Sequence, residues 1–195
     1  MIMKTLVKFI CCKFLYKVNY IGLENLNSVD TCLICPNHSN IFDPFFIYPV
    51  TNNLYIMAKA ELFRNKILAK LLYHYNVFPV DRTKRDPKSL FTALNIFNKD
   101  EHRKLLIFPE GGILKTDDEI GKKIRNGATY ISGKLGLPII PVYITRRSKL
   151  FSKVTVIFGK SFCVDNEILE DKEKLKNKSK ELVETIYSLN YEKKV

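Results

Sequence analysis

Short apolar runs alternate with helical patterns along most of the chain. The runs are four to six residues long and are bounded by charged or turn-forming residues, which is typical of strands. They predict strands at residues 31–35, 54–58, 77–80, 105–108, 139–144 and 154–158.

Apolar residues at helical spacing lie between several of these runs. They predict helices at residues 61–75, 87–98 and 127–135, and a final amphipathic helix after Asp165 and Asn166. Alternating strands and helices predict an α/β fold, with a mostly parallel sheet flanked by helices. The polar stretches NHSNIFD, VDRTKRD and FPEGG follow the first, third and fourth strands. Active residues of such sheets lie in loops beyond the strand ends, so we expect these stretches on one rim.

The first twenty residues are apolar and compatible with a helix, but four lysines interrupt them. No uninterrupted run approaches the roughly 20 residues that a membrane-spanning helix needs. One interpretation is a helix that lies on an anionic membrane with its lysines reaching the headgroups. The other is a core helix with solvated lysines. We expect the membrane, because so much apolar surface at a terminus needs a cover.

The net charge of the chain is +12, and it is unevenly distributed. Lys and Arg outnumber Asp and Glu by ten in residues 51–150. Such a concentrated positive field indicates an anionic partner, which can be nucleic acid, a phosphate-bearing substrate or an acidic membrane. No nucleic-acid-binding motif is visible, and the aromatic residues lie in apolar runs, so we expect no nucleic-acid partner. The length of 195 residues favours one domain with a short appendage.

Five cysteines and the lack of a recognisable secretory signal favour a reducing, cytoplasmic environment. Cys32, Cys35 and His38 have spacings that occur in metal clusters. However, residues three apart in a strand point to opposite faces, and there is no second C-x-x-C pair. We therefore expect no metal site.

The stretch CPNHSNIFDPFF, residues 35–46, places His38 five positions before Asp43. Histidine is the side chain best suited to take a proton near neutral pH, and a carboxylate on its other ring nitrogen would fix the tautomer. No Ser or Cys stands out as a nucleophile, so the simplest chemistry is direct. His38 would deprotonate a substrate hydroxyl, which then attacks an activated acyl carbonyl. The alternative is structural, because Asp43 before Pro44 also fits a helix N-cap.

Further motifs occur in a fixed order: PNHSNIFDP, AKAELFRNKILAKLLYHYNVFPVDR, LLIFPEGG and LPIIPVYI. Over roughly residues 18–165 the chain resembles the glycerolipid acyltransferases, and among them the 1-acylglycerol-3-phosphate acyltransferases. The resemblance implies transfer of a fatty acyl chain from a thioester, on acyl carrier protein or coenzyme A, to the lysophospholipid hydroxyl, giving phosphatidate. No cofactor is implied beyond this donor. It also implies an N-terminal helical part that meets the bilayer.

These expectations define two parts of the chain, a membrane-associating segment at residues 1–20 and an acyltransferase domain at residues 21–195. The protein would lie on the cytoplasmic face of an anionic membrane. By matching position, the resemblance makes His38 the general base and Asp43 the residue that orients it. Substrate binding would fall to Lys59, Arg82, Phe108, Pro109, Glu110 and Gly111, with Arg82 gripping phosphate through its fork of donors.

Three more cations form either a candidate anion funnel or a solvated face: Lys122, Lys123 and Arg125. The main departure from the family is Gly112-Ile113-Leu114, where the family usually has Thr-Arg-Ser after F-P-E-G. This departure keeps open an acyltransferase for another lyso-lipid. A separate alternative is a membrane lipid-binding protein without turnover, against which the intact His38–Asp43 pair argues.

Overall fold

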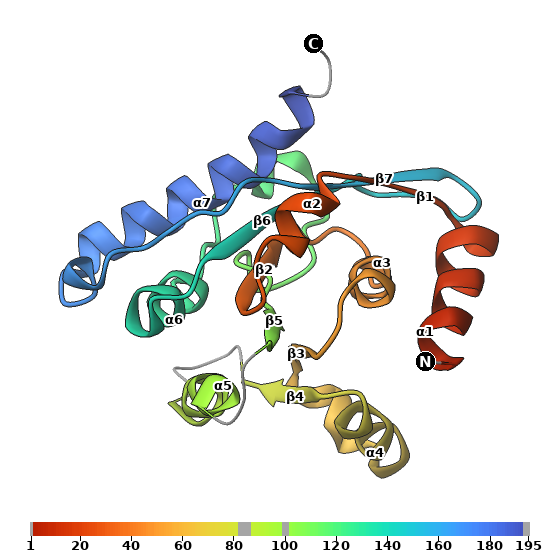
Figure 1. The fold of residues 1–195 in the computed structure, drawn as a ribbon, viewed down its shortest axis with the longest axis horizontal. Helices are drawn as coiled ribbons and strands as arrows, with labels where there is room; N and C mark the ends of the chain where they lie inside the picture. The colour runs from red at the N-terminus through yellow and green to blue at the C-terminus, as the bar shows by residue number, and fades with distance from the viewer. Residues whose placement is uncertain (1, 82–86, 99–101, 193–195) are drawn as a thin grey trace.

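The structure of the protein, a computed structural model, describes residues 2–81, 87–98 and 102–192 (Figure 1). Its centre is a seven-stranded sheet with the order β1-β7-β6-β2-β5-β3-β4. The strands are β1 (Lys17–Ile21), β2 (Cys32–Pro36), β3 (Leu54–Lys59), β4 (Val77–Val80), β5 (Lys104–Leu106), β6 (Ile139–Ile144) and β7 (Lys153–Phe158). All six predicted strands are confirmed, with small shifts at their ends.

Most of the sheet is parallel, as predicted. Strands β4, β3, β5, β2 and β6 run in one direction, while β7 is antiparallel to β6 and parallel to β1. The five parallel strands end at the same edge. Loops that follow these strands are therefore brought together, even when they are distant in the sequence.

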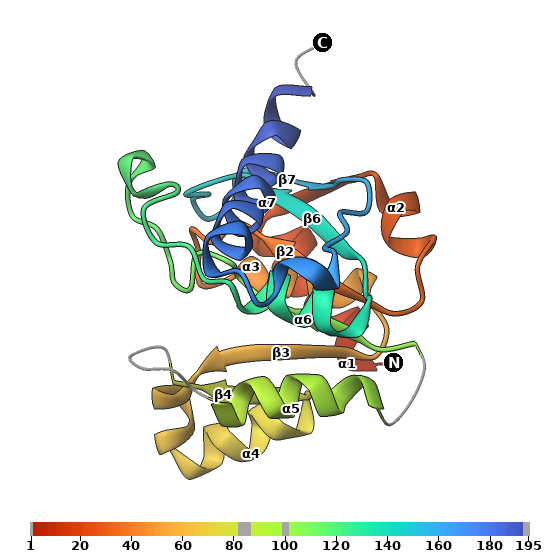
Figure 2. The same ribbon diagram turned by 90° about the vertical axis from the view of Figure 1, so that its left-hand side faces the viewer.

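Helices cover both faces of the sheet. One face carries α1 (Ile2–Val7), the π-helix η1 (Lys8–Leu15), α3 (Asp43–Ile47) and α4 (Lys66–His74). The other carries α5 (Pro87–Asn98), α6 (Gly127–Leu135) and α7 (Lys172–Glu192), which lie over the sheet in Figure 2. Each face has its own apolar core, because alternate residues of the strands point to opposite sides. Short helices lie at Leu23–Asn27, Tyr48–Val50, Ala60–Arg64, Asp117–Glu119 and Asn166–Ile168.

Two predicted helices differ in extent from the observed ones. The stretch 61–75 is split into a 3-10 turn and α4, because the side chain of Asn65 caps α4 by accepting the N–H groups of Ile67 and Leu68. The C-terminal helix begins at Lys172 instead of directly after Asn166, and the side chain of Asp171 caps it. Helices α5 and α6 have the predicted bounds.

Strand β1 was not predicted, and it occupies part of the stretch that we assigned to an N-terminal helix. Residues 17–21 show the alternating exposure of a strand and pair with β7 along their whole length. The preceding Tyr16 is buried and packs edge-on against Phe46. The sequence has no break between helix and strand here, so only pairing with a partner about 135 residues away defines the element. No helix of the described residues has the length and apolar character to span a membrane.

Cys32 and Cys35 lie in β2 and point to opposite faces, as expected, since they belong to different cores. Both are fully buried, and burial raises the pKa of the Cys32 thiol to about 12. In the part of the chain that the structure describes, no three His, Cys, Asp or Glu side chains gather as metal ligands would.

Candidate active site

The candidate site lies where the neighbouring strands β2 and β5 end. The loop after β2 carries His38, and the loop after β5 carries Glu110. This juxtaposition on one rim was predicted. The loop after β4 begins with Asp81, whereas the next residue, Arg82, lies outside the described residues.

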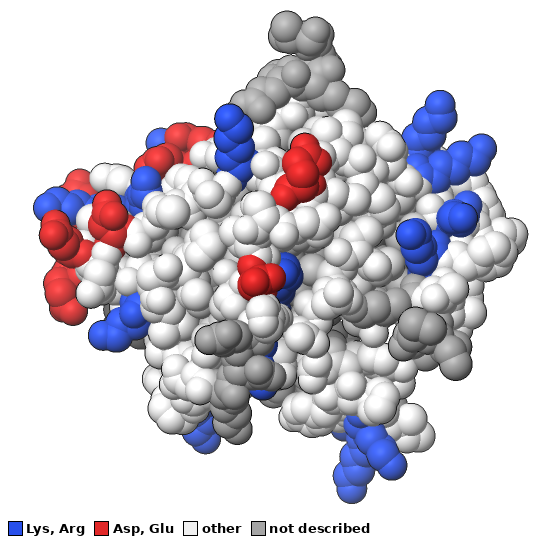
Figure 3. All heavy atoms as spheres, in the orientation of Figure 1, with Lys and Arg blue, Asp and Glu red and all other residues white. Residues whose placement is uncertain are grey.

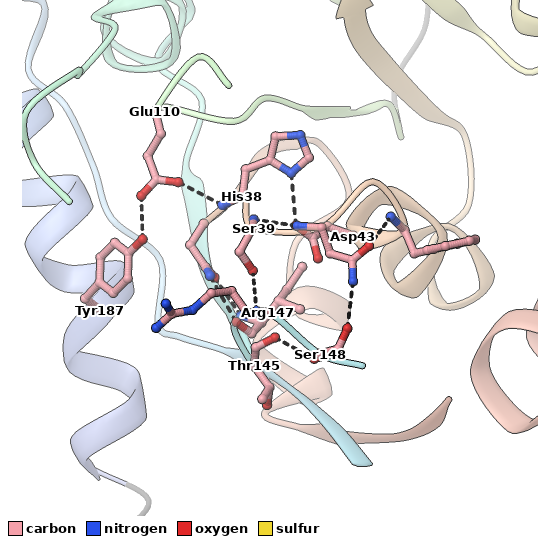
Figure 4. A network of polar contacts seen from close by, with 12 residues as sticks. His38, Ser39, Asp43, Glu110, Thr145, Arg147, Ser148 and Tyr187 are labelled. Atoms are coloured by element: carbon pink, nitrogen blue, oxygen red, sulfur yellow. Dashed lines mark hydrogen bonds and ion pairs between the residues drawn. The ribbon is translucent and has the colours of Figure 1, made fainter. Parts of the chain in front are cut away.

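The loop after β2 curls back so that His38 and Asp43 meet (Figure 4). His38 Nδ1 lies 2.9 Å from Asp43 Oδ2. The same oxygen accepts the main-chain N–H groups of Ser39 at 2.8 Å and Asn40 at 2.9 Å. The short intervening sequence is therefore folded around the carboxylate, which holds both the ring and the loop.

This geometry decides the tautomer of His38. Asp43 Oδ2 already accepts two N–H groups, so Nδ1 carries the hydrogen that the carboxylate accepts, and the lone pair of the neutral ring is on Nε2. No group in the described residues hydrogen-bonds to Nε2. The His38 side chain is 10% exposed and the Asp43 side chain 1%. The site thus presents a nearly buried base with one nitrogen held and the other available.

Asp43 does not cap helix α3. The N-cap position is Phe42, which makes no side-chain capping bond, and Asp43 is already helical. Its carboxylate is turned to His38 and to the loop before the helix instead. The alternative that Asp43 serves only as a helix N-cap therefore does not explain the position of its side chain.

Residues of the F-P-E-G motif support His38 from the other side. The ring of Phe108 stacks on the imidazole, with centroids 3.8 Å apart and an interplanar angle of 23°. Glu110 Oε2 accepts the main-chain N–H of His38 at 2.8 Å, and Oε1 accepts the hydroxyl of Tyr187 at 2.5 Å. Glu110 is only 4% exposed. Both of its oxygens are engaged within the protein.

The surroundings of Glu110 act on its pKa in opposite directions. Burial raises the pKa of Glu110, while hydrogen bonds from Tyr187 and from the His38 N–H, and the charge of Arg146, lower it in part. Burial, together with its bond to Glu110, raises the pKa of Tyr187. The guanidinium of Arg146 lies 5.7 Å from the Tyr187 ring centroid and donates to its hydroxyl at 3.1 Å. Buried Glu110 and half-buried Tyr187 and Arg146 thus form one polar network.

A second set of bonds ties the His38 loop to the end of β6. Asn37 donates to the carbonyl of Ile144 at 3.0 Å and accepts its N–H at 2.7 Å. Ser39 Oγ accepts the N–H of Arg147, and Asn40 donates to the carbonyl of Ser148. Sequence reasoning missed Asn37, Tyr187 and Arg146. The motif around His38 includes Asn37, but no local signal identifies Tyr187, which lies 77 residues from Glu110.

The remaining predicted site residues are distributed around this centre. Pro109 is buried, and its carbonyl accepts the N–H of Arg125 at 2.8 Å. Gly111 has φ +70°, and a Cβ there would lie 2.9 Å from Cγ of Arg125. The Arg125 side chain therefore rests against the P-E-G turn, which requires glycine. Lys122 and Lys123 are exposed.

Lys59 lies at the end of β3 and forms an exposed ion pair with Glu61, at 3.0 Å. The structure thus brings His38, Asp43, Phe108 and Glu110 into direct contact and sets Arg125 against the turn that follows them.

Comparison with known proteins identifies relatives of this chain. The sequence model of the Acyltransferase family matches residues 17–145. The chain is 28% identical over 140 residues to the chloroplastic 1-acyl-sn-glycerol-3-phosphate acyltransferase of Brassica napus, covering 69% of this chain and 39% of that protein. It is 29% identical over 120 residues to the 1-acyl-sn-glycerol-3-phosphate acyltransferase of Bacillus subtilis, covering 60% and 57%. The chain thus spans about two fifths to three fifths of the length of these relatives.

A solved structure shares the fold. The crystal structure of the 1-acyl-sn-glycerophosphate acyltransferase PlsC from Thermotoga maritima superposes with a TM-score of 0.62 at 21% identity, over 90% of this chain and 72% of that one. The family match covers more than half of the chain and includes both the His38–Asp43 loop and the F-P-E-G turn. On this ground the chain belongs to the acyltransferase family.

Proposed function

We propose that the protein is a 1-acylglycerol-3-phosphate O-acyltransferase. It moves a fatty acyl chain from a thioester, on acyl carrier protein or coenzyme A, to the free hydroxyl of the acceptor and yields phosphatidate. The observation that carries the proposal is the His38–Asp43 pair, in which Nδ1 is held at 2.9 Å from the carboxylate and Nε2 is available as a base. The names of the curated relatives support the choice of acceptor.

The proposed reaction is a direct transfer. Nε2 of His38 removes the proton of the acceptor hydroxyl as its oxygen attacks the thioester carbonyl carbon. The carbon–sulfur bond then breaks, and the thiolate leaves and takes the proton from the imidazolium. Asp43 stabilises the imidazolium between these steps, and Phe108 holds the plane of the ring. No covalent enzyme intermediate is formed.

In this proposal, cations near the rim bind the acceptor phosphate. Arg82 follows Asp81 at the end of β4 and offers a bidentate fork, and Lys59 ends β3. Arg125, against Gly111, contributes to an anion funnel with Lys122 and Lys123.

One observation favours a second candidate, an acyltransferase for another lyso-lipid. Ile113 is 46% exposed, and the N–H of the following Leu114 donates to the carbonyl of His38 at 2.9 Å. An alkyl side chain therefore lies on the rim close to the base, where the resemblance implies an arginine. An acceptor headgroup with less negative charge would suit this rim better.

The proposal extends to attachment at the cytoplasmic face of an anionic membrane through residues 1–20. Three apolar side chains of η1 support this part. Phe9 is 62% exposed, Ile10 40% and Phe14 64%. Exposure of these three large apolar side chains to water is unfavourable, and a bilayer would cover them.

Acyl transfer from a labelled thioester tests the proposed activity. The purified chain is incubated with radiolabelled palmitoyl-acyl carrier protein or palmitoyl-coenzyme A and with a panel of lyso-lipids. We expect labelled phosphatidate from 1-acylglycerol-3-phosphate, and none with the His38→Ala variant. Product only from another lyso-lipid would support the second candidate. No transfer with any donor and acceptor pair would overturn both.

A further inference from the structure

Two segments that are far apart in the sequence contain no acidic residue. Neither residues 1–23 nor residues 120–164 include Asp or Glu. Strand β1 belongs to the first segment and β7 to the second, and the two strands pair in parallel. The fold therefore joins two acid-free segments into one basic end of the molecule. Figure 3 shows Lys and Arg side chains gathered on the right, over β1, β7 and the N-terminal helix, with no acidic side chain among them.

Three lysines of this end line one shallow hollow, which we call the basic hollow. It has a volume of about 570 Å³. Its lining consists of Lys13, Lys17 and Lys153, the polar residues Asn19 and Thr155, and the apolar residues Cys12, Val18 and Val154. All three lysines are exposed. None forms an ion pair with Asp or Glu within residues 2–81, 87–98 and 102–192.

Two of these lysines are placed so that their positive charges repel each other when no anion is bound. Lys17 and Lys153 are register partners on neighbouring strands, so their side chains leave the same face of the sheet side by side. Like charges at such positions repel and destabilise the pairing. An anion bound between them would remove the repulsion.

Next to the hollow, two aromatic rings are held out into solvent. Phe14 is 64% exposed and Phe151 63%, and the rings meet edge-on with centroids 6.2 Å apart. The N–H of Phe151 donates to the carbonyl of Leu15 at 2.7 Å, which joins the loop before β7 to the end of η1. Phe151 has φ +66°, a backbone conformation that bulky side chains rarely adopt. The backbone thus holds an apolar ring at the surface, although the conformation is strained.

A soluble anion would neutralise the lysines but leave both rings in water. A membrane lipid meets both requirements, since its phosphate accepts from the ammonium groups while its acyl region receives the rings. We propose that the basic hollow is a binding site for the phosphate headgroup of an anionic membrane lipid, an inference that rests on the membrane attachment proposed above for residues 1–20. The hollow lies at the opposite end of the sheet from β4 and is separate from the His38 site. It would orient the protein on the bilayer by holding β1 and β7 against the headgroups.

Vesicle sedimentation in the absence of any acyl donor tests this proposal. The full chain is mixed with vesicles of equal parts phosphatidylglycerol and phosphatidylcholine, and with vesicles of phosphatidylcholine alone. The test variant carries Lys13→Gln, Lys17→Gln and Lys153→Gln. We expect its partition onto phosphatidylglycerol vesicles to fall about 100-fold, since each lysine near an anionic surface contributes about a factor of five.

A charge-matched control separates the hollow from the general charge of the protein. Lys134→Gln, Lys172→Gln and Lys176→Gln remove the same charge from exposed positions of α6 and α7 that do not line the hollow. We expect this control to lose no more than about threefold, because charges beyond a Debye length are screened. Thermal unfolding of both variants establishes that each is folded. The test variant should not be less stable than the parent, because it loses the repulsion between Lys17 and Lys153.

Three results would overturn the proposal. An equal loss of vesicle partition in the two variants would mean that only the net charge of the protein determines binding. The proposed attachment through residues 1–20 would remain. A parent chain that ignores phosphatidylglycerol vesicles would overturn both the hollow and membrane attachment, but not the acyl transfer. Unchanged partition of the test variant onto phosphatidylglycerol vesicles would show that the three lysines of the hollow do not bind the headgroups.

Discussion

At the scale of single residues, one carboxylate oxygen organises the site. Asp43 Oδ2 accepts from His38 Nδ1 and from the N–H groups of Ser39 and Asn40. Removing the charge of this oxygen would affect both the tautomer of the base and the shape of its loop. The two residues of the pair are therefore not equivalent, since His38 performs the chemistry in the proposed reaction and Asp43 positions it.

Substitution of the pair has a defined expected outcome. His38→Ala should lower the rate of acyl transfer by about 10²- to 10⁴-fold, because proton removal is lost while the fold remains. Asp43→Asn should also be severe, since the amide can hold the wrong tautomer. Steady-state transfer assays together with thermal unfolding measure both effects. An Asp43→Ala variant that loses stability but keeps normal turnover would show that Asp43 has no role in orienting the base.

Buried Glu110 predicts a pH dependence of stability. Its pKa is raised in the folded chain from the ordinary value of 4.5, chiefly by burial. As the pH rises above 4.5, the unfolded chain therefore loses the Glu110 proton before the folded chain does. The folded state binds more protons in this interval, so its stability falls with rising pH until the folded pKa is passed.

Glu110→Gln removes this titration. Urea unfolding of both chains between about pH 4 and about pH 7 gives their free energies of unfolding. We expect the parent to lose stability relative to Glu110→Gln as the pH rises. We also expect a constant difference in the free energy of unfolding between the two chains. It arises because the amide of Gln cannot accept from both His38 and Tyr187. A difference between the two chains that is constant with pH would contradict the raised pKa.

The residues that the sequence identified are those held together by local bonds. His38 and Asp43 are five positions apart, and a short loop can bring them together whatever the rest of the chain does. The support from Tyr187 and Arg146 arises only when α7 and β6 are packed. No spacing in the sequence encodes it. Likewise, Glu110 matched a motif, but its partners became visible only in the fold.

At the scale of elements, helix α7 supports the site as well as the core. Its apolar side, with Leu182 and Ile186, packs on the sheet, and Tyr187 reaches Glu110 behind the His38 loop. The amphipathic pattern predicted this helix. The prediction placed the start of the helix too early, because Asp171 provides the cap instead of Asp165 or Asn166.

Tyr187→Phe isolates the link between α7 and the site. The change keeps the ring but leaves Glu110 Oε1 and a guanidinium nitrogen of Arg146 without the hydroxyl. A buried acceptor that loses its donor costs about 1–3 kcal/mol, and urea unfolding should show a loss of that size. The matched control is Tyr130→Phe on α6, whose hydroxyl has no hydrogen-bond partner in the described part of the chain. Equal stability of the two variants would mean that the Tyr187 bond contributes nothing net.

The missed strand β1 shows what local patterns cannot reveal. The sequence KVNYI continues an apolar, lysine-interrupted run, and only its alternation of exposed and half-buried residues marks a strand. This alternation has a definite meaning only once β7 lies beside it. The strands of the parallel centre were predicted because each stands alone between polar turns.

At the scale of the whole molecule, charge is organised in space and not along the sequence. The surplus of Lys and Arg in residues 51–150 predicted an anionic partner for the middle of the chain. The basic hollow escaped this reasoning, because its lysines come from residues 13, 17 and 153, in segments whose totals are nearly balanced. Pairing of β1 with β7 creates the local excess. The proposed phosphate site at the rim and the hollow are therefore two separate basic regions with different expected partners.

The sharpest prediction concerns the rim and the acceptor phosphate. Arg82 follows Asp81 directly after β4, one of the five strands whose ends form the rim. A phosphate bound there would hold the glycerol so that its hydroxyl reaches His38, and such positioning supplies much of the rate in acyl transfer. Arg82→Lys keeps the charge but loses the two parallel bonds. With 1-acylglycerol-3-phosphate we expect kcat/KM to fall about 10- to 100-fold, the value of a charge-assisted hydrogen bond.

The acceptor dependence distinguishes recognition from folding. With 1-acylglycerol, which has no phosphate, Arg82→Lys should change kcat/KM by no more than about twofold, because the contact is not used. Arg64→Lys, at an exposed arginine of the preceding 3-10 turn, is the matched control and should be neutral with both acceptors. Ile113 sharpens this test. In the proposed site it stands where the resemblance implies an arginine, so binding of the acceptor phosphate would depend more on Arg82. An equal loss of kcat/KM with both acceptors would show that Arg82 supports the fold and does not bind the phosphate.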